Sequence, residues 1–324
     1  MEVAVLEKSN LLKRSKIEYI LVSCCTYKRP KMLALALIHL RRLNLPKNIK
    51  VEVLIVDNAP DYPAIDVVNN FSKNFPTKIH YVQEHNRGLS FARNRLLREA
   101  ESLGATHIAL FDDDGLVDEN WLIEHIEAYQ ATDAHIISGP QYTWFSKNYP
   151  RYITHNNIFK SSSSKKFGTT LNACATNNVF LPVDVYSTNG LYFDEIYVSM
   201  GGEDGDFFNK LSKLGYKIIF NPKAIVKEIT DETRASIFWV ISRSYYNGYS
   251  GALLKFKYNN KWQNKIFYIL KTFFIILLDC IWVLLSMFFG ATCLLNAFCL
   301  LAKNLGKLMG VLKGTMINYY AKQV

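Results

Sequence analysis

The sequence lacks the cysteine patterns that mark a disulfide framework or a zinc site. None of its six cysteines forms a CxxC pair or stands at metal-ligand spacing from a histidine, and three lie in an apolar C-terminal stretch. We therefore expect free thiols in a reducing compartment. Residues 1–16 also lack the uninterrupted apolar core of a signal peptide, because Glu2, Glu7 and Lys8 interrupt them, so we expect a cytoplasmic protein body.

Several common catalytic motifs are missing as well. There is no Ser-His-Asp order, no Walker A loop and no GxGxxG after a predicted strand. No RNA- or DNA-binding motif accompanies the formal charge of +10, so we predict no nucleic-acid partner. Structural roles are favoured for the histidines that fall within predicted helices or strands, namely His39, His80, His107, His125 and His135.

One long apolar stretch is present, from residue 266 to residue 302, and it contains only two charged residues, Lys271 and Asp279. A hydrocarbon core of about 30 Å takes about 20 helical residues, so the stretch is too long for one crossing and tight for two. Lysines on both sides favour an anionic lipid surface and place both ends in the cytoplasm. We expect a re-entrant or hairpin pair of membrane-associating helices with a bend at Gly290. The alternative is a buried or interfacial helical pair in a soluble protein.

Short β-branched runs alternate with helical patterns from Ile17 onward. This alternation predicts an α/β fold with a mostly parallel central sheet flanked by helices. Residues 142–167 lose periodicity and are expected to form an irregular loop over the ligand-binding edge. The predicted strands span 17–25, 51–56, 78–83, 106–111 and 134–138, and the clearest helices span 32–43 and 89–103.

Ligands of open α/β sheets bind where the strands end, because the loops diverge there and helix N-termini face the crevice. The sequence places its distinctive polar residues at or just after such ends, namely Thr26, Asp57, Asn86 and Asp112 to Asp114. Three adjacent carboxylates after a buried strand repel one another unless a cation or hydrogen-bond donors compensate. Mg²⁺ or Mn²⁺ held by one or two carboxylates and by substrate phosphates would do so. A solvated acidic turn, or a cap for the following helix, is the alternative.

A second acidic cluster follows two glycines in the run Gly202-Glu203-Asp204-Gly205-Asp206. Such residues often only complement a helix dipole, but together with the first cluster they can supply a general base. Arg243 lies in a helical pattern, where it is either a solvated residue or the partner of an acid. A guanidinium also suits a diphosphate, because its planar fork binds two oxygens at once.

Five motifs in order resemble the family 2 inverting glycosyltransferases of the GT-A fold over about residues 17–250. The motifs are Val22-Ser23-Cys24-Cys25-Thr26-Tyr27-Lys28-Arg29-Pro30, Val53-Leu54-Ile55-Val56-Asp57-Asn58, Asn86-Arg87-Gly88-Leu89-Ser90-Phe91-Ala92-Arg93-Asn94, Phe111-Asp112-Asp113-Asp114 and Gly202-Glu203-Asp204-Gly205-Asp206.

The resemblance implies a role for several residues in holding a nucleotide-sugar donor. Thr26 and Asp57 would contact the nucleoside, with Asp57 reading uracil, and Asp112 would lie beside the ribose. Arg93 would be a further donor contact, and Arg243 would lie near the diphosphate.

The same resemblance implies the chemistry. Asp204 would be the catalytic base, supported by Glu203, and Asp114 would bind a divalent metal, Mn²⁺ or Mg²⁺. Many relatives have a histidine after the final strand as a further metal ligand. Here either Glu228 takes its place or the metal relies on fewer protein ligands. The Gln-x-x-Arg-Trp motif of processive members is absent, which favours the addition of a single sugar.

These expectations combine into one prediction. The chain has an N-terminal extension (1–16), a GT-A domain (17–255) and a basic, apolar, membrane-associating helical region (256–324). It transfers one sugar from a UDP-sugar to a lipid-linked saccharide acceptor at the cytoplasmic face of the bacterial inner membrane, in surface polysaccharide biosynthesis. The alternatives are a metal-dependent sugar nucleotidyltransferase and a non-catalytic, membrane-tethered, sugar-nucleotide-binding scaffold.

Overall fold

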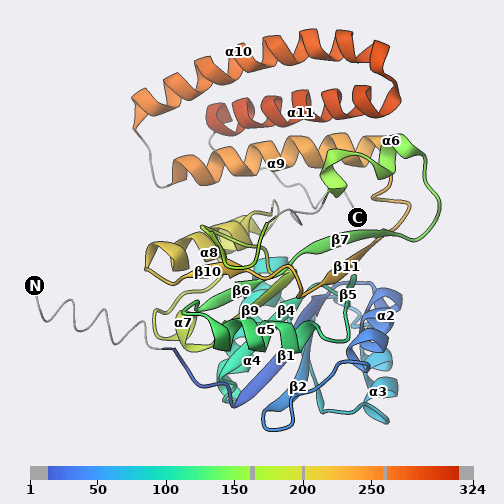
Figure 1. The fold of residues 1–324 in the computed structure, drawn as a ribbon, viewed down its shortest axis with the longest axis vertical. Coiled ribbons are helices and arrows are strands. Elements are labelled where there is room, and N and C mark those ends of the chain that lie inside the picture. The colour runs from blue at the N-terminus through green and yellow to red at the C-terminus, as the bar shows by residue number, and fades with distance from the viewer. Residues whose placement is uncertain (1–13, 161–164, 199–200, 258–260, 314–324) are drawn as a thin grey trace, which may run out of the picture. The chain divides into compact units, whose positions relative to one another are not determined.

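The computed structural model describes residues 14–160, 165–198, 201–257 and 261–313 (Figure 1). Most of the predicted N-terminal extension and residues 161–164 of the predicted loop lie outside the described residues. The boundaries predicted after residues 16 and 255 stay predictions. The chain forms two units, the first made of Met1–Tyr142, Ser162–Val198 and Glu203–Glu228, and the second of Thr143–Ser161, Ser199–Gly202 and Ile229–Val324.

The first unit is built on one eight-stranded sheet. Its strands in spatial order are β3 (Ile79–Gln83), β2 (Lys50–Asp57), β1 (Tyr19–Thr26), β4 (His107–Phe111), β9 (Asn178–Pro182), β6 (Ile136–Ser138), β10 (Ile218–Phe220) and β8 (Thr169–Leu171). The strands from β3 to β4 are all parallel, β9 runs antiparallel to both neighbours, β10 is parallel to β6, and β8 is antiparallel to β10. The predicted α/β fold with a central sheet is confirmed.

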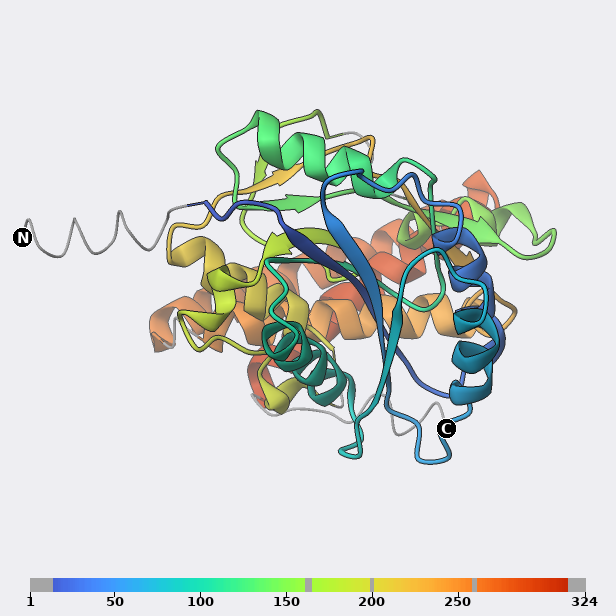
Figure 2. The same ribbon diagram turned by 90° about the horizontal axis from the view of Figure 1, so that it is seen from below.

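Helices cover both faces of this sheet, as Figure 2 shows for the strands nearest the viewer. They are α2 (Pro30–Leu40), α3 (Ile65–Ser72), α4 (Leu89–Ser102), α5 (Trp121–Ala131), α7 (Asp184–Ser187) and α8 (Glu203–Lys213). Successive side chains of a strand point to opposite faces, and β1 is apolar at almost every position, so it contributes to a core on each side.

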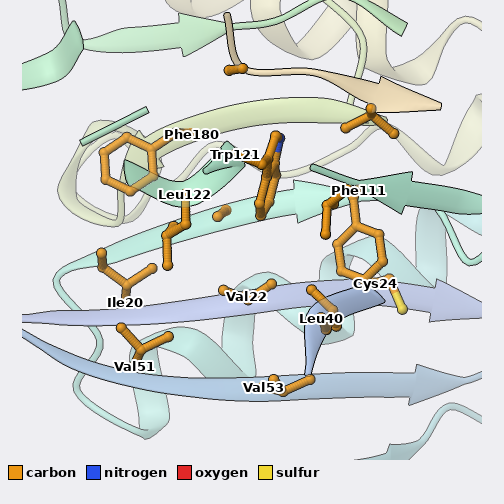
Figure 3. Close-up of a cluster of buried hydrophobic side chains, with 14 of the residues drawn as sticks. Ile20, Val22, Cys24, Leu40, Val51, Val53, Phe111, Trp121, Leu122 and Phe180 are labelled. Carbon is orange, nitrogen blue, oxygen red and sulfur yellow. The ribbon is translucent and has the colours of Figure 1, made fainter. Parts of the chain in front are cut away.

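The two cores contain different helices. Ile20, Val22 and Cys24 of β1 pack with residues of α2, α3 and α5, and Figure 3 shows them beside Trp121 and Phe180. The alternate β1 residues pack with α4 and α8. Burying an apolar side chain in this way stabilises the fold by about 1.5–3 kcal/mol.

The prediction of an irregular loop at residues 142–167 was wrong in part. The segment contains β7 (Gln141–Phe145), α6 (Arg151–Thr154) and the short helix η1 (Asn157–Phe159). These elements are too short to display a helical or strand period in the sequence. The other short elements are β5 (Gly115–Val117), η2 (Glu195–Tyr197) and β11 (Val226–Thr230).

The second unit contains three long helices, α9 (Ile237–Lys257), α10 (Trp262–Ser286) and α11 (Ala291–Lys313). The short helix η3 (Met287–Phe289) follows α10, and Gly290, with a φ of +87°, separates it from α11 where the sequence predicted a bend. Two stretches, Trp262–Phe289 and Ala291–Lys313, are long and apolar enough to cross a membrane by length and composition.

Helices α9 and α11 touch through their backbones at glycines. A Cβ atom added to Gly306 of α11 would lie 2.0 Å from the carbonyl oxygen of Tyr245, and one added to Gly248 of α9 would lie 1.9 Å from that of Lys303. Only glycine permits so close an approach, because any side chain would overlap the facing backbone.

We predict that Gly306→Ala destabilises the protein by about 1–3 kcal/mol, because the added methyl forces the two backbones apart. Gly251→Ala in α9 is the matched control, since a Cβ atom there meets nothing within 4 Å. Alanine is the better helix former by up to about 1 kcal/mol, so the control variant should be as stable as the parent or slightly more stable. Thermal unfolding of the purified variants measures both effects. Equal melting temperatures for the two variants would contradict the packing described.

Candidate active site

Three parallel strands bring their carboxyl ends to one edge of the sheet. Thr26, the last residue of β1, stands opposite Asp57, the last residue of β2. β4 lies on the other side of β1 and ends at Phe111, directly before the acidic run. The structure therefore gathers the predicted strand-end residues at a shared edge.

Asp113 faces inward and joins β1 to the acidic run. Its side chain is buried, and its Oδ2 accepts a hydrogen bond of 2.7 Å from the Thr26 hydroxyl. Arg29 Nη1 lies 3.4 Å from the other oxygen. Burial, reinforced by the charge of Asp114, raises the pKa of Asp113 to about 7. The hydroxyl of Thr26 is thus already engaged, and its predicted contact with a nucleoside stays a prediction.

Asp114 is also buried, and Arg29 Nη1 lies 3.0 Å from its Oδ2. Asp112 differs from both neighbours because about two fifths of its side chain is exposed. A solvated acidic turn, the alternative from sequence, is wrong, because Asp113 and Asp114 are only 5% and 4% exposed. The capping alternative fits Asp118 and not the triplet, because Asp118 Oδ1 accepts a hydrogen bond of 3.1 Å from the N–H of Asn120, directly before α5 begins at Trp121.

Arg93 connects the two acidic clusters. It projects from α4, its side chain is 9% exposed, and it forms an ion pair and hydrogen bond with Glu203, the first residue of α8. Its Nη2 also lies 3.8 Å from Asp112 Oδ1. Burial disfavours the guanidinium charge, but the nearby carboxylates outweigh it and raise the pKa of Arg93. Burial raises the pKa of Glu203, against the lowering effect of Arg93.

Neighbouring hydrogen bonds hold α4 in the position that this bridge requires. Asn94 donates to the carbonyl of Phe193 at 2.9 Å and accepts from its N–H at 2.7 Å. At the start of α4, Gly88 has a φ of +141° and donates its N–H to Asn58 Oδ1 at 2.8 Å. A Cβ atom at Gly88 would lie 2.4 Å from Val198, so both the conformation and the space require glycine.

Asp204 lies beside Glu203 in the first turn of α8 and is half-buried. Its Oδ1 accepts a hydrogen bond of 2.7 Å from the N–H of Gly205. The third acid of this turn, Asp206, is buried and pairs with Lys210 at 2.9 Å. The three carboxylates therefore have different surroundings, and Asp204 is the most accessible of them.

Asp57 lies deep in the structure, with no exposed surface. Its carboxylate accepts hydrogen bonds from the N–H groups of Ala59 and Ala64 and from the Tyr81 hydroxyl, at 3.0, 3.2 and 3.0 Å. These bonds hold the loop after β2, and the predicted contact of Asp57 with uracil stays a prediction.

The two remaining predicted residues lie in different places. Glu228 stands opposite Gly115 in the antiparallel pairing of β11 with β5, one residue beyond Asp114. Arg243 is half-buried in α9, in the second unit. Their roles at metal and diphosphate stay predictions.

The described residues contain no group of three or more His, Cys, Asp or Glu side chains arranged to hold a metal ion. Metal binding by Asp114 and Glu228 therefore stays a prediction, and an ion held by them would take its remaining ligands from substrate phosphates and water.

Sequence reasoning missed three residues that hold this edge together. Arg29 and Asp113 had no predicted role, and Asn58 had none beyond its motif, although it also donates to the carbonyls of Glu84 and Asn86 at 2.8 and 2.7 Å. The sequence did contain a signal for Arg29. It is a basic residue just after the end of a strand, at the edge where three carboxylates were predicted.

The cysteines at the edge are not candidate nucleophiles. Burial raises the pKa of Cys24 well above its usual value and that of Cys25 to about 12. Both thiols therefore stay protonated at neutral pH.

Solved glycosyltransferases share this fold. The mannosyltransferase PcManGT of Pyrobaculum calidifontis, in complex with GDP-Man and Mn²⁺, aligns with a TM-score of 0.57 at 16% identity, over 99% of this chain and 85% of its own. S. aureus TarS 1–349 in complex with UDP aligns with a TM-score of 0.52 at 13% identity, over 87% and 89%. The fold is the GT-A fold of glycosyltransferases.

The sequence comparison defines the family within this class. Residues 22–188 match "Glycosyl transferase family 2", and residues 107–307 match "Glycosyl transferase family group 2". The succinoglycan biosynthesis protein ExoM of Rhizobium meliloti is 31% identical over 227 residues, which are 70% of this chain and 72% of that protein. A glucosyl-dolichyl phosphate glucuronosyltransferase of Haloferax volcanii is 22% identical over 228 residues, 67% and 71% of the two chains. The chain belongs to glycosyl transferase family 2, as its motifs predicted.

We predict that Arg93→Ala destabilises the protein by about 3–5 kcal/mol, because it leaves Glu203 buried without its partner. Arg95→Ala is the matched control on the same helix, because Arg95 pairs with Glu99 at the surface and exposed pairs contribute about 0–1 kcal/mol. Chemical denaturation measures both changes. Similar stabilities for the two variants would show that the bridge does not hold the clusters together.

Proposed function

We propose that this family 2 glycosyltransferase moves one sugar, with inversion at the anomeric carbon, from a UDP-sugar to a lipid-linked saccharide. The observation that carries the proposal is the double contact of Arg93 with Asp112 and Glu203, because it brings the two acidic clusters into one site. The cluster with Asp112 and Asp114 then binds the donor, and the cluster with Glu203 and Asp204 acts on the acceptor.

Asp204 is the proposed catalytic base. An in-line displacement needs a carboxylate that removes the proton of the attacking hydroxyl while the nucleotide diphosphate leaves. Asp204 is half-buried and lies next to Glu203, which Arg93 holds in place. Glu203 Oε2 is buried and has no hydrogen-bond partner among the described residues, so we expect bound substrate or water to supply the missing donor.

Asp114 is the proposed metal ligand, and Asp112 is the proposed contact with the donor. Glu228, on the facing strand, is a further candidate metal ligand. A divalent ion bound there would neutralise the charge that grows on the leaving diphosphate. The chain itself contributes two guanidinium groups to this acidic edge, Arg29 and Arg93. Thr26 and Asp57, at the ends of β1 and β2, are the proposed nucleoside contacts, and Arg243 is the proposed diphosphate contact.

Known proteins support the choice of substrates. TarS has been solved with UDP and with UDP-GlcNAc, whereas PcManGT has been solved with GDP-Man, so this fold binds more than one nucleotide carrier and UDP is our proposal for this chain. ExoM takes part in succinoglycan biosynthesis, and the Haloferax enzyme is named for a dolichyl phosphate-linked substrate. The apolar helices of the second unit agree with a lipid-borne acceptor, so we assign the enzyme to bacterial surface polysaccharide biosynthesis at the cytoplasmic face of the inner membrane.

Asp204→Asn is expected to lower the rate of UDP release by about 10²–10⁴-fold while donor binding persists, because the variant lacks only the base. Purified enzyme is incubated with Mn²⁺ and a panel of UDP-sugars, with UDP release and thermal stabilisation by the donor as readouts. Asp66→Asn, which removes an acid from the first turn of α3, controls for the loss of a helix-terminal charge.

Three outcomes would contradict the proposal. Unchanged turnover in Asp204→Asn would exclude this base, and full function in cells after the same change would favour a scaffold. Release of pyrophosphate from a nucleoside triphosphate and a sugar phosphate would favour the nucleotidyltransferase.

Chelation by EDTA is expected to abolish transfer, and added Mn²⁺ to restore it, because one charge-stabilising ligand typically contributes a factor of about 10²–10³ in rate. Asp114→Asn should raise the Mn²⁺ concentration needed for half-maximal rate by at least about tenfold. Full activity in EDTA, with the donor intact, would refute the metal dependence.

A further inference from the structure

Helix α10 is apolar on the side that faces away from the rest of its unit. Large side chains there are about half exposed or more, including Phe274 at 61% and Ile281 at 55%. They continue along the whole helix at helical spacing, so they form one continuous outward strip. The principal members are Phe267, Leu270, Phe274, Leu277, Ile281 and Leu285.

The opposite side of α10 is partly polar and is buried against α11. Its buried residues recur three or four positions apart and include Thr272, Asp279 and Ser286. Asp279 is 5% exposed and accepts a hydrogen bond of 2.7 Å from Asn304 of α11, which in turn accepts one of 2.8 Å from Lys307. A soluble protein turns its apolar side inward, and α10 does the reverse. The alternative of a buried helical pair in a soluble protein does not fit this sidedness.

Charged residues near the midpoints of both apolar helices argue against a crossing. Lys303 is exposed at the middle of α11, and Lys271 is exposed near the middle of α10. If either helix crossed a bilayer, its lysine would lie close to the centre, where a charge costs at least about 2.5–3.5 kcal/mol. A helix that lies along the surface instead lets its lysines reach the headgroups.

The packing of α9 gives an independent argument against a crossing by α11. The close approaches at Gly248, Gly306 and Gly310 fix α9 along α11, so the two helices move as one layer. α9 exposes Asn247, Lys255 and Lys257. Because Gly248 lies against Lys303 at the middle of α11, inserting α11 across the bilayer would carry the neighbouring Asn247 into hydrocarbon as well.

We propose that α10 alone enters lipid, lying in the plane of one leaflet of an anionic membrane, with α11 forming a second layer outside the hydrocarbon. The outward strip faces the acyl chains about 5–10 Å below the headgroups, as interfacial helices do. Lys271, Lys261 and Lys265 meet the anionic headgroups. This orientation would hold the enzyme against the membrane that carries its acceptor, and in that respect it rests on the proposed function.

Depth measurements along α10 test this orientation. Phe267, Phe274, Ile281 and Leu285 are replaced one at a time by a cysteine carrying a fluorophore, in a full-length background whose native cysteines are replaced and which still binds vesicles. Vesicles of phosphatidylcholine and phosphatidylglycerol contain lipids with quenchers at two depths. We expect all four positions to report the same shallow depth. A crossing helix would report depths spread over about 15 Å, deepest at its middle, and would overturn the proposal.

Polar substitutions test which helix contacts lipid. Phe274→Asn with Ile281→Asn should weaken binding to the anionic vesicles by at least about a hundredfold, because two large side chains no longer enter the acyl layer. Leu300→Asn with Leu305→Asn removes two exposed leucines from α11 and should leave binding unchanged. Equal losses for the two pairs would overturn the single-helix contact.

A second copy of the chain is the other possible cover for the strip. No vesicle binding, together with a dimer in light scattering that Phe274→Asn with Ile281→Asn converts to monomer, would also overturn the proposal. The release of UDP from a UDP-sugar in solution is measured in parallel, so that a failure of the membrane orientation is distinguished from a failure of the proposed activity.

Discussion

The buried pairing of Arg93 with Glu203 and Asp112 is the interaction on which the candidate site depends. Glu203 begins α8 and Asp112 follows β4, and without a shared cation the buried Glu203 and the partly exposed Asp112 would repel each other. The rest of the edge keeps Arg93 in position. Gly88 and Asn58 fix where α4 begins, and Asn94 ties the helix to the chain that leads into α8.

The acidic edge carries an internal charge balance that suits a leaving diphosphate. Arg29 lies beside Asp113 and Asp114, so the buried members of the triplet have a protein cation, while Asp112 stays partly exposed. A divalent ion arriving with its nucleotide would add positive charge where negative charge grows during transfer. Burial, which raises the pKa of both Asp113 and Glu203, makes these compensating charges necessary for the folded site.

The part of the fold nearest the site could be predicted from sequence because it follows simple periodicities. The parallel strands are short β-branched runs, each ending in a distinctive polar residue, and this pattern predicted which residues share an edge. The pairing of Asp113 with Thr26 and Arg29 could not be predicted, because it depends on which way each side chain of a turn faces. The short elements at residues 141–159 were missed for lack of a period. The outward strip of α10 could not be predicted either. When most of a helix surface is apolar, the sequence does not indicate which side packs against neighbouring helices.

The central claim is that the two acidic clusters form one site, with the donor on the side of Asp112 and Asp114 and the base on the side of Asp204. A crystal structure of the protein with UDP and Mn²⁺, with the ion located by its anomalous signal, tests it most directly. The account predicts the ion at the carboxylate of Asp114 and the ribose beside Asp112, with the nucleoside near Thr26 and Asp57 and with Asp204 facing the open side of the diphosphate. An ion or a nucleotide bound away from the ends of β1, β2 and β4 would contradict it.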